Sequence, residues 1–322
     1  MPFETIGSPL LWAGFVVFVL AMLAIDLGVF HKKAHEVSLK EAGIWSAVWV
    51  GLAVVFNVGV YIWFGPDRAL EFSTGYLIEK ALAVDNIFVF VVIFSTFAIP
   101  PIYQHRVLFW GVLGALVMRA NFIVLGGALL QRFHWSLYFF GAILAITGIK
   151  LLLQRNQEIH PERNPIVRAF QKLVPMTHEF HGDKFLVLKN GRRYATPLLL
   201  ALVAVEVTDL IFAVDSIPAI FAITKDPFIV FTSNIFAILG LRSLYFLLAG
   251  VITKFTYLKV GLSVVLIFVG AKMLLVDVYK VPIAASLGII AGILGLSVAV
   301  SLLKSSSGAQ KTTDDSRQPL ER

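Results

Sequence analysis

The chain contains a series of apolar stretches of about 20 residues, and this feature limits its fold more than any other. A helix of that length crosses the hydrocarbon core of a bilayer. We predict nine spans, at 9–30, 42–64, 73–98, 106–130, 135–153, 197–222, 228–250, 256–276 and 282–303. The expected fold class is therefore an all-α membrane protein with about nine transmembrane helices, and residues 1–303 form a single polytopic membrane domain.

The composition fits this class. Of the 322 residues, 58% are hydrophobic and the mean hydropathy is +0.84, whereas a soluble domain is nearer half apolar. The chain has no cysteine, so any metal site must use oxygen or imidazole ligands. The net charge of +7 reports membrane orientation and not nucleic-acid binding, because Lys and Arg gather in particular connections.

The distribution of Lys and Arg predicts the orientation. If the N-terminus is outside, the outer connections hold only Arg68, Arg132, Lys225 and Lys280, and the other Lys and Arg residues of the connections are inside. Cytoplasmic connections are enriched in these residues, so we predict N-out and C-in.

The long connection 154–196 is cytoplasmic on this topology. Its pattern predicts a short interfacial helix at 164–173 and a hairpin at 185–195 with an Asn-Gly turn. The tail, 304–322, is polar and is expected to be disordered.

One acidic motif occurs twice inside the apolar segments. The first copy runs from Glu79 to Asp85 and the second from Asp209 to Asp215, and Glu206 lies one helical turn before the second copy. An ionised carboxylate at that depth costs roughly 3 kcal/mol or more, so such groups usually mark a functional site such as an ion path. Two matching copies in one chain point towards a transporter.

The similarity between the two halves extends beyond this motif. Arg119 and Arg242 follow the two copies, and Gly148-Ile-Lys and Gly270-Ala-Lys follow the arginines. Spans three to five therefore resemble spans six to eight. A unit of three spans must insert with opposite polarity, and the Lys and Arg distribution agrees. We predict an inverted repeat, which would place a substrate near the bilayer midplane where the repeats meet.

Helix geometry restricts how the acids can meet. Residues six apart on a straight helix differ by about 240° in direction and about 9 Å in height. Glu79 and Asp85, or Asp209 and Asp215, therefore cannot ligate one ion from an unbroken helix. Either the helix unwinds, or the Asp of each copy meets its counterpart while the other acid lies nearer an entrance. Pro218 favours unwinding in the second copy, because it cannot donate to the carbonyl one turn earlier.

The candidate site is rich in oxygen ligands. Its candidate metal ligands are Glu79, Asp85, Asn86, Glu206, Asp209, Asp215 and Ser216. Sites of this type suit Mg²⁺, Ca²⁺ and Mn²⁺, which favours a divalent-cation path. The alternative is structural ion pairing with Lys80, Arg119 and Arg242. The five acids exceed these three cations by two charges, which a divalent cation or two protons would balance, so we favour the ion path.

Two further features are left open. Asp26 lies near the inner end of the first span and is either part of a gate or a solvated or paired end residue. His178, Glu179, His181 and Asp183 form a cluster in the cytoplasmic loop. A polar loop is the simpler interpretation of this cluster than a metal site.

Four long stretches carry a resemblance to a known family. They are Thr74–Asn86, Tyr194–Leu198, Glu206–Phe221 and Asp226–Arg242. They resemble the TerC family of integral membrane proteins, most closely its Alx-like branch, and the likeness covers nearly the whole chain. It implies a multi-pass protein of the bacterial inner membrane, manganese export and a response to alkaline pH. The resemblance also carries over Glu79, Asp85 and Asp215, followed by Asp209, as residues of the Mn²⁺ path.

We therefore expect Mn²⁺ as the substrate, protons as the coupling ion and no permanently bound cofactor. Exporting a divalent cation from an inside-negative cell costs about 4.6 kcal/mol per 100 mV, so export needs coupling. The second hypothesis is a non-transporting membrane partner that assists insertion or metalation of other proteins or senses alkaline pH. Enzymatic activity is not expected, because no nucleophile–base arrangement stands out.

Overall fold

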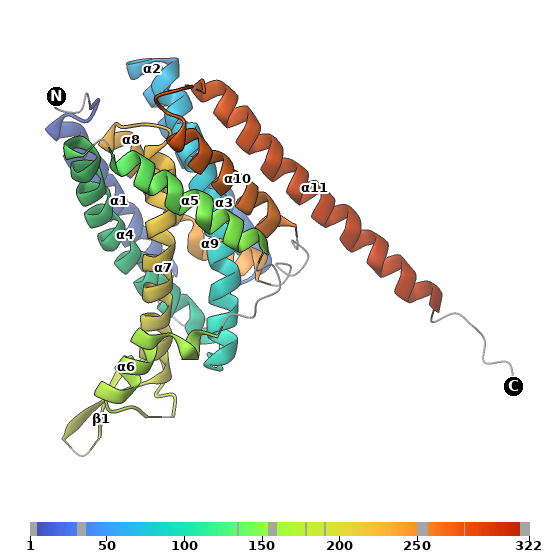
Figure 1. Cartoon of the computed structure of the whole chain (residues 1–322). Coiled ribbons are helices and arrows are strands. Elements are labelled where there is room, and N and C mark those ends of the chain that lie inside the picture. Colours follow the sequence, from blue (N-terminus) through green and yellow to red (C-terminus); the bar gives the residue numbers. More distant parts are fainter. Residues whose placement is uncertain are drawn as a thin grey trace, which may run out of the picture.

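The computed structural model describes residues 5–30, 37–133, 135–153, 160–177, 179–189, 191–249, 257–279 and 281–315. In these ranges the chain forms helices and a small two-stranded sheet (Figure 1). The longer helices are α1 (Pro9–Phe30), α2 (Leu39–Phe64), α3 (Pro66–Thr96), α4 (Pro101–Arg132), α5 (Ser136–Leu153), α7 (Pro197–Phe221), α10 (Leu258–Leu274) and α11 (Ile283–Asp315). The shorter elements are η1 (Pro161–Arg163), α6 (Pro165–Leu173), β1 (Leu186–Lys189), β2 (Arg192–Ala195), α8 (Pro227–Leu239) and α9 (Leu241–Leu248).

The prediction of an all-α membrane protein is confirmed. Among the described residues, α2, α4, α5, α7 and α11 are long and apolar enough to cross a membrane, and α8 with α9, bent by 40° at their junction, can form a sixth span. Helices also lie at the other predicted positions, but α1 and α10 offer shorter apolar runs, and α3 carries several charged residues. Nine crossings and the N-out orientation stay predictions.

Proline marks the start of several helices. α3, α4, α7 and α8 each have proline in the first turn, where its fixed φ suits the helix and no backbone donor is lost. Before α8, Asp226 caps the helix by accepting from the backbone N–H of Phe228 at 2.9 Å. The same carboxylate accepts from Thr5 and Ile6. Asp226 thereby ties the N-terminal segment to the start of α8.

The connection between α5 and α7 projects from one end of the helical bundle, as Figure 1 shows. It contains α6 and the antiparallel hairpin of β1 and β2, in which Leu186 pairs with Ala195 and Lys189 with Arg192. Gly191 has a φ of +75°, a left-handed conformation that glycine adopts without strain. Asn190, the other predicted turn residue, lies outside the described residues.

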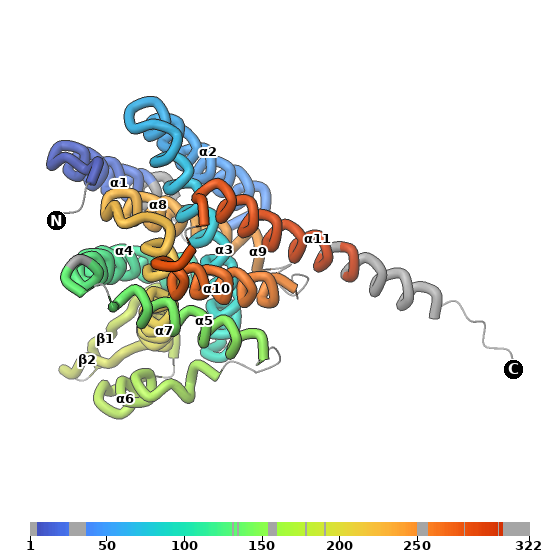
Figure 2. The backbone as a smooth tube through the Cα atoms, turned by 45° about the horizontal axis from the view of Figure 1, so that its top comes forward, coloured from blue at the N-terminus to red at the C-terminus, as the bar shows by residue number. Residues whose placement is uncertain are grey.

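The last helix runs further than the sequence pattern suggests. α11 continues to Asp315, past the expected end of the ninth span at residue 303 and into the segment expected to be disordered. The described side chains of this helix begin beside α10, and α11 packs against α10 and α3 (Figure 2). Residues 316–322 lie outside the described residues.

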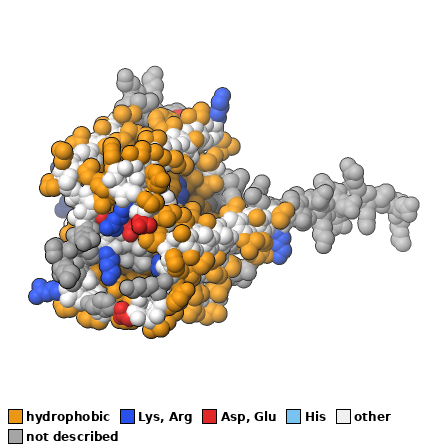
Figure 3. All heavy atoms as spheres, turned by 90° about the horizontal axis from the view of Figure 1, so that it is seen from above, with side chains coloured by type: hydrophobic (Ala, Val, Ile, Leu, Met, Phe, Trp, Pro, Cys, Tyr) orange, Lys and Arg blue, Asp and Glu red, His pale blue; other side chains and the backbone are white. Residues whose placement is uncertain are grey.

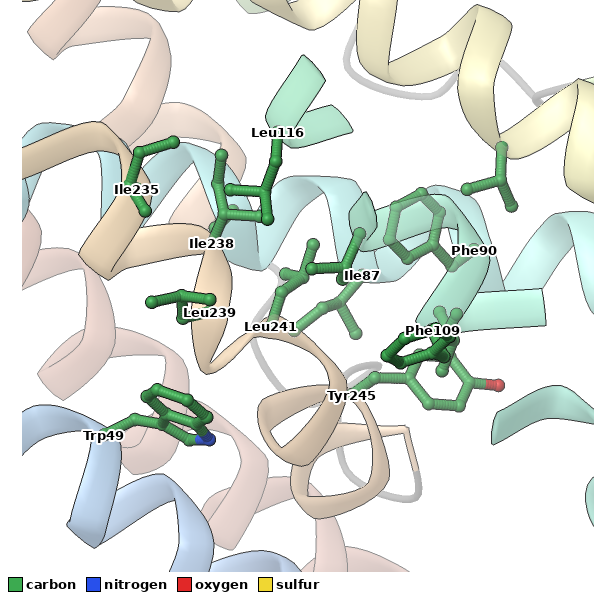
Figure 4. Close-up of a cluster of buried hydrophobic side chains, with 14 of the residues drawn as sticks. Trp49, Ile87, Phe90, Phe109, Leu116, Ile235, Ile238, Leu239, Leu241 and Tyr245 are labelled. Carbon is green, nitrogen blue, oxygen red and sulfur yellow. The ribbon is translucent and has the colours of Figure 1, made fainter. Parts of the chain in front are cut away.

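The interior and the surface of the bundle are both apolar. One buried cluster joins α2, α3, α4, α8 and α9, and includes Trp49, Ile87, Phe90, Leu116 and Ile235 (Figure 4). Hydrophobic side chains also cover much of the outer face seen in Figure 3. Large apolar side chains of α2 and α4 are among the exposed ones. An exterior this apolar is suited to lipid and not to water.

Two glycines bring α5 and α10 into close contact. A Cβ atom on Gly148 of α5 would lie 2.8 Å from the carbonyl oxygen of Ser263, and one on Gly270 of α10 would lie 2.6 Å from the backbone nitrogen of Ala145. Close backbone approach at small residues is typical of helix pairs in membranes. These glycines occupy corresponding positions in the two predicted repeats, so both copies of the Gly-x-Lys pattern serve one interface.

Adding one methyl group to this interface should weaken the fold. We expect Gly270→Ala to lower the free energy of unfolding by about 1–3 kcal/mol, because the new Cβ forces the two backbones apart. Unfolding in mixed micelles with increasing denaturing detergent measures the effect. Gly292→Ala on α11 is the matched control, because no atom lies within 4 Å of its new Cβ. Equal stability of the two variants would contradict the tight α5–α10 contact.

Candidate functional site

Arg119 of α4 joins the two copies of the acidic motif. Its Nη2 atom donates to Oδ1 of Asp209 at 2.8 Å and its Nε atom to Oδ2 at 3.2 Å. Its Nη1 atom donates to Oε1 of Glu79. Glu79 comes from α3 and Asp209 from α7, so one guanidinium connects the first helices of both predicted repeats.

This ion-pair cluster is closed to solvent. Arg119 is 1% exposed, Glu79 0% and Asp209 3%. Nη1 of Arg119 also lies 3.4 Å from Oγ of Ser216 on α7 and 3.4 Å from Oδ1 of Asn234 on α8. The cluster therefore connects four helices, and each of its side chains is buried. Removing the single cation from such a buried cluster is expected to cost several kcal/mol, because both carboxylates then lack a partner.

Asn234 contacts Arg119 but was not among the candidate ligands predicted from the sequence. It lies in α8, a helix whose other residues are largely apolar, and its side chain is fully buried. An amide inside an apolar membrane segment is a sequence signal for a polar partner. That signal was available, but the identity of the partner, Arg119 on α4, required the tertiary structure.

The expected unwinding at Pro218 is wrong. α7 runs without a break from Pro197 to Phe221, with Pro218 inside it. Proline removes one backbone hydrogen bond, but a helix packed between neighbours can keep its course. α7 packs against α3, α4 and α5. Asp209 and Asp215 therefore keep the divergent directions that six residues of helix impose.

The second acid of each copy points to a different helix. Asp215 on α7 accepts a hydrogen bond from Oγ1 of Thr147 on α5 at 3.2 Å. Asp85 on α3 lies within the electrostatic reach of Lys259 on α10. The first acids of the two copies, Glu79 and Asp209, are the pair that shares a partner.

The other candidate residues lie on the same two helices. Glu206 has Asp209 as a like-charged neighbour one turn away. Its carboxylate lies directly against Gly114 of α4, where a Cβ would collide with it. Asn86 is buried on α3, seven residues after Glu79 and hence on the same helix face. The cluster around Arg119 thus includes Glu79, Asp209 and Ser216, and Glu206 borders it.

Several buried polar atoms of this region have no hydrogen-bond partner within the described part of the chain. They are Oε2 of Glu79, Oε2 of Glu206, Oδ1 of Asn86 and Nδ2 of Asn234. Unpaired buried acceptors are costly. Three of the four atoms are oxygens, which a proton or a cation could satisfy.

The described residues contain no group of three or more His, Asp or Glu side chains that could hold a metal ion. The candidate ligands are therefore not gathered into one coordination shell in this structure. Lys80, one of the cations considered for neutralising the acids, donates instead to the carbonyl oxygen of Ala237 at 3.2 Å. Arg119 pairs with two acids, so its single positive charge leaves one of their two negative charges unbalanced.

The acids of the loop between α5 and α7 are paired with basic side chains. Glu179 accepts from Lys189 at 3.0 Å, and Asp183 pairs with Arg106. The hydrogen bond from Lys189 lowers the pKa of the Glu179 carboxyl below its ordinary value, with further contributions from the charges of Lys189 and His181. These contacts agree with a polar loop. His178 and the side chain of Asp26 lie outside the described residues.

Acids outnumber bases in the cluster, so replacing the arginine and replacing an acid should change the free energy of unfolding by different amounts. We expect Arg119→Met to lower the free energy of unfolding by about 3–5 kcal/mol, because two buried carboxylates lose their cation. Glu79→Gln should leave stability unchanged or raise it, because one acid remains for one arginine. The same mixed-micelle unfolding assay measures both, with Arg132→Met at the exposed end of α4 as the control. A large loss of stability in Glu79→Gln would indicate a balanced structural pair.

Comparison with known proteins gives consistent matches. Residues 64–309 match the integral membrane protein TerC family. An uncharacterized membrane protein of Myxococcus xanthus, STKORF319, is 62% identical over 303 residues, which cover 94% of this chain and 95% of that protein. Alx of Escherichia coli (strain K12), provisionally named a membrane-bound redox modulator, is 51% identical over 308 residues, covering 92% of this chain and 96% of Alx. No solved structure matches.

Proposed function

Because this chain belongs to the TerC family of integral membrane proteins, we propose that it exports a divalent cation, Mn²⁺, across the bacterial inner membrane in exchange for protons. The observation that carries the proposal is the buried cluster in which a single arginine serves two carboxylates, Glu79 and Asp209. The choice of manganese rests on the resemblance to the Alx-like branch. The oxygen-rich site chemistry is compatible with it but does not select it over other hard divalent ions.

The charge of the cluster supports a cation path. Arg119 offers one positive charge against two carboxylates, and Glu206 adds a third acid next to Asp209. An isolated buried charge is strongly disfavoured unless it is paired. Protons or a metal ion are the mobile species that supply the missing positive charge. A site that must bind either protons or a metal ion is suited to exchanging protons for metal.

The packing of the helices supports alternating access through an inverted repeat. Helices α3, α4 and α5 would correspond to α7, the α8–α9 pair and α10. The contacts are reciprocal: α3 packs on α8 while α4 packs on α7, and α3 meets α10 while α5 meets α7. Asp85 facing α10 and Asp215 facing α5 follow the same exchange. Repeats related in this way can rock around a site that they share.

The name of the Alx relatives is compatible with metal transport. A modulator of redox state that acts through its own thiols needs cysteine, and this chain has none. An indirect effect, through the supply of a redox-active metal ion such as Mn²⁺, requires no thiol. Transport is therefore the simpler way for a cysteine-free chain to influence redox state.

Proton exchange provides the driving force that export needs. Moving two charges out of an inside-negative cell costs about 4.6 kcal/mol per 100 mV, whereas a tenfold inside excess of metal returns only about 1.4 kcal/mol. A plain uniporter would import the ion under these gradients. Carboxylates that release metal as they take up protons couple the two flows.

Vesicles that contain the purified protein test the proposal directly. We expect Mn²⁺ flux that follows an imposed pH gradient, and at least tenfold slower flux in Glu79→Gln, Asp85→Asn and Asp215→Asn, because each variant loses a charge on the path. Asp67→Asn, an exposed acid at the start of α3, is the control and should transport normally. Flux that ignores the pH gradient would exclude coupling, and normal flux in all three variants would exclude this path.

The second candidate is a non-transporting membrane partner, which the projecting hairpin favours. Its exposed basic residues include Lys189, Arg192 and Arg193, and Figure 1 shows the hairpin extending beyond the helices. On this hypothesis the double variant Arg192→Glu with Arg193→Glu fails to complement a strain that lacks the protein, whereas Glu79→Gln complements it. Transport predicts the opposite pattern in the same complementation assay.

A further inference from the structure

We propose that Arg119 is a built-in counter-ion that competes with the transported cation for Glu79 and Asp209. The inference rests on the proposed function and extends it, since it says how the site handles its charge when the cargo leaves. A guanidinium on α4 and a divalent cation would alternate as partners of the same two carboxylates. Arg119 is thus a positioning residue that sets affinity and release.

The guanidinium is placed where a metal ion would have to bind. Its nitrogens reach one carboxylate from each predicted repeat, Glu79 on α3 and Asp209 on α7, and two neutral oxygens, those of Ser216 and Asn234. Carboxylate, hydroxyl and amide oxygens are also the ligands that hard divalent cations take. The guanidinium therefore occupies the place between these oxygens that a divalent cation would take once they close around it.

Arg119 holds its two carboxylates, Asp209 and Glu79, with different strength. Asp209 is held by two donors, Nε and Nη2, in a bidentate arrangement. Glu79 is held by Nη1, which also faces Ser216 and Asn234. A bidentate pair is the stronger and more directional contact. We infer that Glu79 separates from Arg119 first, while Asp209 keeps its hold on the guanidinium.

Glu79 also has a free coordination position. Its second oxygen, Oε2, is buried and has no hydrogen-bond partner among the described residues. Nδ2 of Asn234 is likewise unpaired there. An incoming cation can therefore bind Glu79 before Arg119 moves, and its charge then repels the guanidinium. Return of Arg119 to Glu79 would assist release.

The pairing of Arg119 predicts how its variants behave. Arg119 occupies the two carboxylates that it pairs with, Glu79 and Asp209, so removing the guanidinium makes both of them available to a divalent cation. It also removes the group that displaces the ion. We expect tighter binding together with slower turnover, which loss of structure alone would not produce.

Thermal unfolding of the purified protein across a range of Mn²⁺ concentrations tests the inference. We expect Arg119→Gln to be stabilised by Mn²⁺ with an apparent Kd at least tenfold lower than that of the unmodified protein. Arg119→Lys, which keeps the charge, should remain within threefold of the unmodified value. Arg132→Gln, at the exposed end of the same helix, is the control and should not change the apparent Kd.

Flux in vesicles supplies the second readout. Arg119→Gln should lower both the KM for Mn²⁺ and the turnover, by about tenfold each, and Arg119→Lys should restore turnover. If Arg119→Gln does not fold without metal, recovery of folded protein on purification with Mn²⁺ supports the inference. Failure of Mn²⁺ to recover it, while Arg119→Gln with Asp209→Asn folds, overturns the inference.

The outcomes separate this inference from the proposed function. An unchanged apparent Kd in Arg119→Gln, in a protein whose unmodified form transports Mn²⁺, overturns the counter-ion role and leaves transport in place. Tighter Mn²⁺ binding by Arg119→Gln, in a protein whose unmodified form transports none, supports the counter-ion role and refutes transport.

Discussion

The structure depends on the need to balance charge in an interior that excludes water. Glu79 and Asp209 are buried at the contact between α3 and α7, and neither carboxylate could remain ionised there alone. Arg119 supplies a shared positive charge from α4. Because the guanidinium also faces Asn234 on α8, the relative placement of four helices is linked to this one group.

Helix periodicity then directs the two acids of the motif to different neighbours. On an unbroken helix, residues six apart face different neighbours, and α7 is unbroken. Asp209 faces Arg119, whereas Asp215 faces Thr147 on α5. The motif thus combines an acid for the central cluster with an acid directed to the α5 and α10 layer.

Small residues complete the arrangement at that layer. Gly148 and Gly270 let the backbones of α5 and α10 approach closely. α5 also contacts α7, and α10 contacts α3. In the proposed transport cycle, this contact is the place where one repeat would move against the other. The surrounding surface is apolar and suited to lipid.

Much of the architecture was available from the sequence. The hydrophobic segments predict helices at positions that the structure confirms, because a 20-residue apolar run has few alternatives in a bilayer. The hairpin at residues 186–195 follows from its turn residues. The unbroken course of α7 at Pro218 was not predictable, because packing against neighbouring helices outweighed the local effect of proline.

The sequence by itself determined which side chains need partners: ionisable groups among apolar residues, repeated in the same order, must be paired or functional wherever they lie. Only the tertiary structure decided the pairing. That Arg119 serves both Glu79 and Asp209, and that Asn234 joins them, depends on how four helices pack. Residues that are 40 and 90 positions apart in the chain meet because side-chain packing fixes the helix rotations, and no local pattern records that rotation.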